Sequence, residues 1–425
     1  MIAPLLAVLG LSAIGAGAGW WAGGGLATRR DALDPTSPVR AAVLAYLVFH
    51  VAGSVVLLVT GESDGAGPLL AAGALAAFGI GAAVARRFLG PQPRFGPPVD
   101  RGLSRLGVAV LAAIGLVALG TLVARYGLPL LSSDPVISRA GFSGLAFDLF
   151  RWFVPVAAVA TAALAFARPS RRDAWLAVGA VGAVGGLEVL LASRALPAEL
   201  AIEVLLVAVW AGARLSRRAW IALAAAALAL FVGIQLVRVA PQNLYQGVSG
   251  AADFAARRTI DRVLLIHPRT LEVVATTIPA QEPYFAGSTY VRRISILLGQ
   301  GEHPSLGYWL YERLFPGETG GFAAPSVAGE AWANGGPILV VLVMAALGVL
   351  AAWLGGVLAR LPGGPADRAF AAVVVVAVAR TYATSLNGFL LTLVVSTGWW
   401  LVASGRLRSF VVRDRAATPS IPEAG

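Results

Sequence analysis

Eleven apolar runs divide the chain, and most approach the length that a helix needs to cross a lipid bilayer, about 20 residues. The runs cover residues 1–25, 40–60, 67–88, 102–125, 147–167, 174–192, 196–213, 219–238, 336–359, 369–386 and 388–405. Their apolar residues fill every side of a helix instead of alternating, and hydrocarbon cannot satisfy the open edge of a strand. The sequence therefore predicts an all-α fold, a polytopic membrane bundle of about 11 transmembrane helices.

The basic residues indicate how this bundle is oriented. All 33 are arginines, the formal net charge is +11, and the arginines gather in every second connection. The groups are Arg29, Arg30 and Arg40; Arg86, Arg87, Arg94, Arg101 and Arg105; Arg168, Arg171 and Arg172; Arg214, Arg217 and Arg218; Arg360 and Arg368; and Arg406, Arg408, Arg413 and Arg415. Arginine-rich connections face the cytoplasm. We therefore expect an outer N-terminus, a cytoplasmic C-terminus and one long extracytoplasmic loop at about 239–325.

The composition supports a single membrane-embedded domain. With 58% hydrophobic and only 13% charged residues, the chain lies outside the range of soluble proteins. We expect one integral membrane domain over residues 1–415 and a disordered cytoplasmic tail over 416–425, which is polar and proline-bearing. Because the arginines follow the topology, the lipid bilayer is an expected partner and nucleic acid is not.

The first apolar run is expected to be an uncleaved helix. No positive residue precedes it and its arginines follow it, which is the reverse of a secretory signal. Gly15, Gly19 and Gly23 repeat at a spacing of four residues, which lets a neighbouring helix approach closely.

Metal and thiol chemistry have little support in the sequence. The chain contains no cysteine and only three histidines, His50, His267 and His303. A thiolate nucleophile and a histidine-rich metal site are therefore excluded, and we expect neither a metal ion nor a cofactor.

Ionisable residues within the apolar runs demand an explanation, because each costs roughly 2.5–3.5 kcal/mol at bilayer depth. Arg194 lies in one predicted hairpin with Glu188, Glu199 and Glu203. The group is either a buried ion-pair cluster that fixes helix packing, or the floor of an outward-facing cavity in which Arg194 holds an anion. Arg380 either pairs with Glu199 or Glu203 or points into the same cavity.

The long outer loop carries paired arginines and many aromatic residues. Arg257, Arg258 and Arg262, and then Arg292 and Arg293, can grip phosphate oxygens bidentately, or they can face solvent and lipid headgroups. Its aromatic residues suit either a saccharide groove or a membrane-interface belt. They are Tyr284, Phe285, Tyr290, Tyr308, Trp309 and Tyr311.

Three segments give the chain a resemblance to a known family. They are ASRALPAE at 192–199, YFAGSTYVRRI at 284–294 and GGFAAPSVAGEAWANGG at 320–336. In this order they resemble motifs of the oligosaccharide repeat-unit polymerases, the Wzy-type O-antigen and exopolysaccharide polymerases. The match covers roughly residues 190–355, and its most specific part keeps seven positions in register. These are Pro325, Ser326, Gly329, Glu330, Trp332, Asn334 and Gly335.

The resemblance implies a metal-independent membrane glycosyltransferase with a GT-C-like fold, located in the bacterial cytoplasmic membrane. Such an enzyme joins undecaprenyl-pyrophosphate-linked oligosaccharide units on the outer face, with a chain-length regulator and a flippase as expected protein partners. Glu330 is the first candidate to orient or deprotonate the attacking hydroxyl, and His303 is the second. The candidates for binding pyrophosphate or sugar are Arg194, Arg258, Arg292, Arg293, Arg380, Tyr290, Ser326 and Asn334.

Alternatives remain at the level of both residue and function. Ser326 and the nearby glycines either provide an anion seat at a helix start or simply cap a helix that holds a buried, hydrogen-bonded Glu330. The same topology also suits an O-antigen-ligase-like transferase, or a flippase for polysaccharide or lipid.

Overall fold

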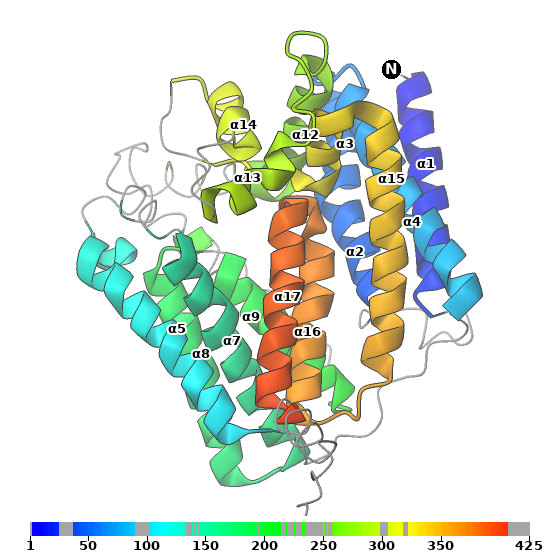
Figure 1. Ribbon diagram of the computed structural model, residues 1–425. Coiled ribbons are helices and arrows are strands. Elements are labelled where there is room, and N and C mark those ends of the chain that lie inside the picture. Colours follow the sequence, from blue (N-terminus) through cyan, green and yellow to red (C-terminus); the bar gives the residue numbers. More distant parts are fainter. Residues whose placement is uncertain are drawn as a thin grey trace, which may run out of the picture.

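The computed structural model is a bundle of long helices (Figure 1). It describes residues 2–24, 37–89, 103–132, 144–193, 195–213, 259–297, 305–317 and 322–406, with the isolated positions 138, 142, 218, 225, 229, 232–234, 250, 253 and 257. For residues 262, 263 and 293–297 it describes the backbone alone. Every element in these ranges is helical, which confirms the predicted all-α class.

The elements follow the apolar runs of the sequence. Those of the first half are α1 (Ile2–Ala22), α2 (Pro38–Tyr46), η1 (Leu47–Ala52), α3 (Gly53–Thr60), α4 (Ala66–Leu89), α5 (Arg105–Tyr126), η2 (Pro129–Leu131), α7 (Gly144–Ala167), α8 (Arg171–Leu190) and α9 (Ala195–Trp210). Those of the second half are η4 (Asp261–Leu265), α12 (Ile266–Thr277), α13 (Ser288–Leu297), α14 (Leu306–Leu314), α15 (Ser326–Ala359), α16 (Pro365–Ala379), η5 (Arg380–Ala383) and α17 (Leu386–Ala403).

Eight helices within the described ranges are long and apolar enough to cross a membrane. They are Ile2–Ala22, Pro38–Thr60, Ala66–Leu89, Arg105–Leu131, Gly144–Ala167, Arg171–Leu190, Ser326–Ala359 and Leu386–Ala403. The predicted runs 196–213 and 369–386 form the shorter helices α9 and α16, of 16 and 15 residues. The predicted run 219–238 lies largely outside the described residues, so the count of eleven stays a prediction.

Glycines bring α1 close to α4 and α2, and bring α15 close to α4. A Cβ at Gly15 of α1 would lie 2.5 Å from the carbonyl oxygen of Leu75 in α4. One at Gly19 or Gly23 would lie 2.6 Å from a side chain of α2, which confirms the packing role predicted for this glycine spacing. On its other side α4 meets α15, where a Cβ at Gly348 would lie 2.0 Å from a backbone oxygen of α4. Because lipid provides no hydrophobic drive between helices, such close approach supplies the packing energy.

Helix α15 is interrupted near its start. Gly335 and Gly336 have non-helical backbone angles, and Gly336 has a φ of 67° that favours glycine. Pro337 follows and opens the longer helical stretch, at a position where its missing N–H costs nothing. The residues from Ser326 to Asn334 therefore form a separate short helical piece ahead of the longer helical stretch.

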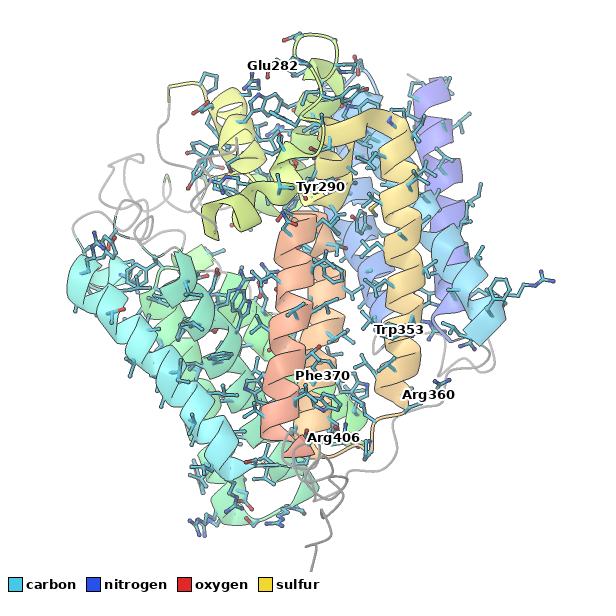
Figure 2. The ribbon with its side chains drawn as sticks, in the orientation of Figure 1. Glu282, Tyr290, Trp353, Arg360, Phe370 and Arg406 are labelled. Carbon is cyan, nitrogen blue, oxygen red and sulfur yellow. The ribbon has the colours of Figure 1, made fainter. Side chains whose placement is uncertain are left out.

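The bundle has two distinct ends. Figure 1 shows the N-terminus together with α12, α13 and α14 at one end, and the last turns of α15 and α17 at the other. Arg360 and Arg406 lie at this second end in Figure 2. The N-terminus and the described parts of the 239–325 loop thus share an end, as the predicted topology requires, while the side of the membrane that each end faces stays a prediction.

Candidate functional site

The three segments that the sequence singled out share an unusual backbone feature. The described chain contains three non-glycine residues with φ in the left-handed region, namely Ala192 at 52°, Ala286 at 47° and Ser326 at 60°. One lies in each segment. Such conformations cost of order 1–3 kcal/mol and cluster at functional sites. The coincidence supports the choice of these segments as parts of a site.

Glu330 joins the second and third segments to the start of α17. Its carboxylate accepts hydrogen bonds from the Thr289 hydroxyl at 3.1 Å and from the Leu386 backbone N–H at 2.7 Å. One turn later, the Asn334 amide accepts from the Gly287 N–H at 2.8 Å and donates to the Thr289 hydroxyl at 2.7 Å. We call this network the clamp. Glu330 is 2% exposed, and the clamp holds residues 287–289 on the first turns of α15.

Tyr290 lies beside the clamp with one polar atom unused. The Asn387 side-chain amide donates to the backbone carbonyl oxygens of Thr289 and Tyr290. The Tyr290 hydroxyl is buried and has no hydrogen-bond partner among the described residues. Burial first, and then the charge of Glu330, raise the pKa of this phenol, so it remains a neutral hydrogen-bond donor.

Ser326 begins α15 and caps it. Its hydroxyl accepts a hydrogen bond from the Gly329 N–H at 3.0 Å, and the residue is fully buried. This bond satisfies one of the backbone donors that a helix start leaves open. The predicted cap is therefore confirmed, whereas the anion seat at the same helix start stays a prediction.

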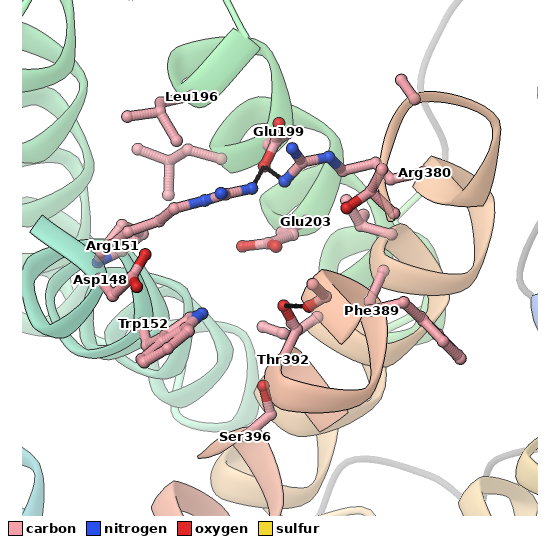
Figure 3. A pocket seen from close by; sticks show the side chains of 18 of the residues that line it. Asp148, Arg151, Trp152, Leu196, Glu199, Glu203, Arg380, Phe389, Thr392 and Ser396 are labelled. Atoms are coloured by element: carbon pink, nitrogen blue, oxygen red, sulfur yellow. Dashed lines mark hydrogen bonds and ion pairs between the residues drawn. The ribbon is translucent and has the colours of Figure 1, made fainter. Parts of the chain in front are cut away.

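A cavity of about 260 Å³ is lined by side chains of α7, α8, α9, α16, η5 and α17 (Figure 3). Its wall includes Phe322, Ala324 and Pro325, which directly precede α15. Thr384 and Ser385, which precede α17, also line it. The clamp and the cavity are thus adjacent. Residues 322–325 lead into the helix that carries Glu330, and residues 384–385 lead to Leu386, whose N–H donates to Glu330.

The cavity is lined by ionisable side chains from four elements. Arg380 of η5 donates to the Glu199 carboxylate at 2.5 Å, and Arg151 of α7 lies 3.7 Å from the same oxygen. Figure 3 shows the two guanidinium groups meeting at Glu199, with Glu203 nearby. The predicted pairing of Arg380 with Glu199 is therefore confirmed, and Arg380 also lines this cavity, while the outward-facing cavity floored by Arg194 stays a prediction because Arg194 lies outside the described residues. Glu188, from the same predicted hairpin, is a further buried carboxylate residue in the cavity lining.

Arg151 is the site residue that sequence reasoning missed. It lies in the apolar run 147–167, and so do its cavity neighbours Asp148 and Trp152. The available signal was a charged residue within a run long enough to span a membrane, which indicates function by default. The same rule had singled out the hairpin and Arg380.

Several predicted site residues lie outside the described residues. They are Arg194, Arg258 and His303, together with the side chain of Arg293. Arg292 is described and half-buried on α13. Neither a joint phosphate site for these arginines nor a role for His303 is tested, and both stay predictions.

Two pairs of loop aromatics differ in how they pack. Trp309 packs edge-on against Phe285, donates to Glu282 at 2.8 Å and lies under the Arg313 guanidinium at 3.9 Å. Tyr308 and Phe322 instead form an edge-on pair, with exposed fractions of 50% and 56%. Since Phe322 also lines the cavity, this pair lies at the cavity's rim.

No group of three or more histidine, cysteine or acidic residues that could hold a metal ion occurs within the described part of the chain. The metal-independent site therefore stays a prediction.

No protein-family model, curated protein or solved structure matches the chain. The family resemblance accordingly rests on the three sequence segments alone.

Proposed function

We propose that the protein is a membrane glycosyltransferase that polymerises undecaprenyl-pyrophosphate-linked oligosaccharide repeat units on the outer face of the bacterial cytoplasmic membrane. The observation that carries the proposal is the cavity. It combines two arginines with buried carboxylates inside an apolar bundle, and the motif-bearing segments 192–199 and 320–336 supply part of its wall. The proposal includes the GT-C-like fold, eleven spans, an outer N-terminus and a cytoplasmic C-terminus.

The proposed reaction breaks the bond between the anomeric carbon of the growing chain and a phosphate oxygen. The pyrophosphate leaves with the electron pair, and a hydroxyl oxygen of the acceptor sugar bonds to the anomeric carbon and gives up its proton to a base, for which Glu330 is the first candidate and His303 the second. The leaving group carries concentrated negative charge, which preorganised cations stabilise best in a site shielded from water. Arg380 and Arg151 supply such charge, and each keeps donors beyond those directed at Glu199.

A complementation experiment tests the proposal. The gene is deleted in its host and restored as wild type, Arg380→Ala, Arg380→Lys or Arg151→Ala at matched membrane abundance, and lipid-linked glycans are resolved by size. We expect the deletion to lose the ladder and to accumulate single lipid-linked units. Arg380→Ala should behave like the deletion, and Arg380→Lys should recover part of the ladder, since lysine keeps the charge but not the bidentate fork. Arg125→Ala is the control, because Arg125 does not line the cavity.

A transporter of lipid-linked glycan is the second candidate. Ionisable side chains within membrane spans also mark substrate and proton pathways, and the interruption of α15 is a feature that transporters share. Long lipid-linked chains that persist in the deletion strain would refute polymerisation. Their retention on the cytoplasmic face would then support transport, and their failure to reach a final acceptor would support ligation.

A further inference from the structure

The chain between α16 and α17, residues 380–385, has two different sides, and we call it the turn. It begins with the short 3₁₀ helix η5, in which residues three positions apart lie on the same side. Arg380 and Ala383 accordingly line the cavity, whereas Thr381 and Tyr382 do not. Figure 1 shows the turn directly below α12 and α13, and η5 contacts α2 and α15. The contacts that hold Thr381 and Tyr382 therefore also affect where Arg380 points.

Two side chains of the second membrane span hold the side of the turn that faces away from the cavity. The His50 Nε2 of η1 lies 3.1 Å from the carbonyl oxygen of Tyr382. The Tyr46 hydroxyl of α2 donates to the carbonyl oxygen of Thr381 at 3.5 Å. Because a carbonyl oxygen only accepts, the His50 imidazole donates through Nε2. Both side chains are fully buried.

The break in the helix explains why the turn needs these donors. A helix end leaves its last carbonyl oxygens without partners, and such groups are costly where water is excluded. A histidine within a membrane span needs a reason as well, and His50 satisfies one carbonyl oxygen of the turn. Phe49 stacks on the Tyr382 ring with centroids 4.2 Å apart, and His267 of α12 meets that ring edge-on at 5.0 Å. Tyr382 is therefore fixed through both its backbone and its ring.

We propose that His50 is a positioning residue for Arg380, because its hydrogen bond to Tyr382 fixes the turn so that the guanidinium stays on Glu199 and faces the cavity. The inference rests on the proposed function, in which Arg380 binds the pyrophosphate. His50 does not line the cavity, so it acts through the turn and does not contact the substrate. Arg380 is two positions from Tyr382, and its guanidinium lies 2.5 Å from Glu199. A displacement of about 1 Å is enough to impair such a preorganised group.

The alternative is that His50 serves stability alone. Its replacement would then lower the melting temperature and change ligand binding, if at all, by the same factor whether or not Arg380 is present. A positioning residue behaves differently, because groups that act through one another have non-additive effects. Binding measured in a double-mutant cycle therefore separates the two roles.

The test measures binding of the lipid-linked repeat unit, extracted from the deletion strain, to the purified protein in lipid nanodiscs. The variants are His50→Leu, which removes the donor, His50→Gln, whose amide can donate to the Tyr382 carbonyl, Arg380→Ala, and the double variant of His50→Leu with Arg380→Ala. Trp400→Phe is the matched control. It removes a 2.8 Å hydrogen bond to Asp367 at the other end of the same helical hairpin, and Trp400 does not line the cavity.

We expect His50→Leu to weaken binding by about tenfold when Arg380 is present, as the loss of one hydrogen bond implies. The same substitution should change binding by less than about twofold in the Arg380→Ala background. His50→Gln should regain most of the affinity. Trp400→Phe should lower the melting temperature and leave the affinity unchanged.

Two provisions keep the test decisive. If His50→Leu does not fold, His50→Asn replaces it, because the shorter amide does not reach the Tyr382 carbonyl. If Arg380→Ala binds too weakly for a cycle, the recovery of affinity by His50→Gln decides the result.

Three outcomes overturn the inference and are distinguishable. If the wild type does not bind the lipid-linked unit, the proposed function fails and the inference fails with it. If the wild type binds and His50→Leu binds equally well, the inference alone fails. If His50→Leu weakens binding by the same factor with and without Arg380, or if His50→Gln regains no affinity, His50 supports the fold and does not position Arg380.

Discussion

Glu330 offers the sharpest separation between a structural and a catalytic role. Its carboxylate accepts two hydrogen bonds, from Thr289 and from the Leu386 N–H, in a setting that is 2% exposed. A hydrogen bond to a charged group contributes about 1.5–3 kcal/mol. Glu330→Ala removes both and leaves two donors without this acceptor, so it should cost about 3–6 kcal/mol and detach the segment around Thr289 from α15.

Glu330→Gln should cost roughly half as much, because the neutral amide keeps the shape and an acceptor but loses the charge that strengthens both bonds. If the carboxylate serves the clamp, the glutamine variant keeps a glycan ladder while the alanine variant loses it. Thermal unfolding of the purified variants in detergent, together with the complementation assay, measures both quantities. Glu312→Gln is the control for loss of charge alone, since Glu312 is an exposed carboxylate of α14.

One result would refute the clamp reasoning. If Glu330→Gln unfolds at the wild-type temperature and reaches wild-type abundance, yet yields only single lipid-linked units, the carboxylate acts on the reacting hydroxyl as the sequence hypothesis has it. A double-mutant cycle with Thr289→Val adds a second check. We expect a coupling energy of about 0.5–3 kcal/mol between the two sites, as for residues in one hydrogen-bond network.

Two further predictions concern other parts of the structure. Gly336→Ala should destabilise the protein by about 1–3 kcal/mol, because its φ is 67° and a Cβ would lie 2.6 Å from the Tyr284 hydroxyl oxygen. Gly356→Ala in the same helix meets no neighbour and should stabilise by about 0.5–1 kcal/mol, and equal melting temperatures for the two would contradict this. Arg269 donates to Glu62 and thereby lowers the pKa of that carboxyl from 4.5. The exposed pair should therefore stabilise the fold by less than about 1 kcal/mol above pH 4.5. Once the pH falls below the lowered pKa, Glu62→Gln should have the same free energy of unfolding as the wild type. A difference in stability that persists at acid pH would refute this.

Helix positions were predictable from the sequence because the bilayer imposes a length and an apolar composition on each span. The glycines of α1 were predictable for a related reason, since their fixed spacing acts within a single helix. The shorter helices α9 and α16 show the limit of the argument. Residues Pro365–Val378 of α16 are buried by neighbouring helices, so this stretch is apolar whatever its length, and hydropathy alone cannot separate a full span from an enclosed piece.

The clamp was only partly predictable. The sequence placed Glu330 and Asn334 one turn apart and therefore on one face of a helix, and it singled out the segment that contains Thr289. Local spacing could not reveal that Thr289 would lie between them, because this contact joins residues 41 and 45 positions apart. Nor could it reveal the positive φ values, since Ala286 and Ser326 are not residue types that favour that conformation.

The cavity depends on contacts of still longer range. Arg380 and Glu199 are 181 positions apart, and each was identified because a lone charge in a membrane helix is costly. That rule identifies the residues but not their partners. The partners in the structure separate Glu188 from Glu199. Arg151 and Arg380 offset the charge of Glu199, so those three side chains explain one another. Glu188 has no hydrogen-bond partner within the described chain, so the contacts that explain Glu199 do not explain its burial.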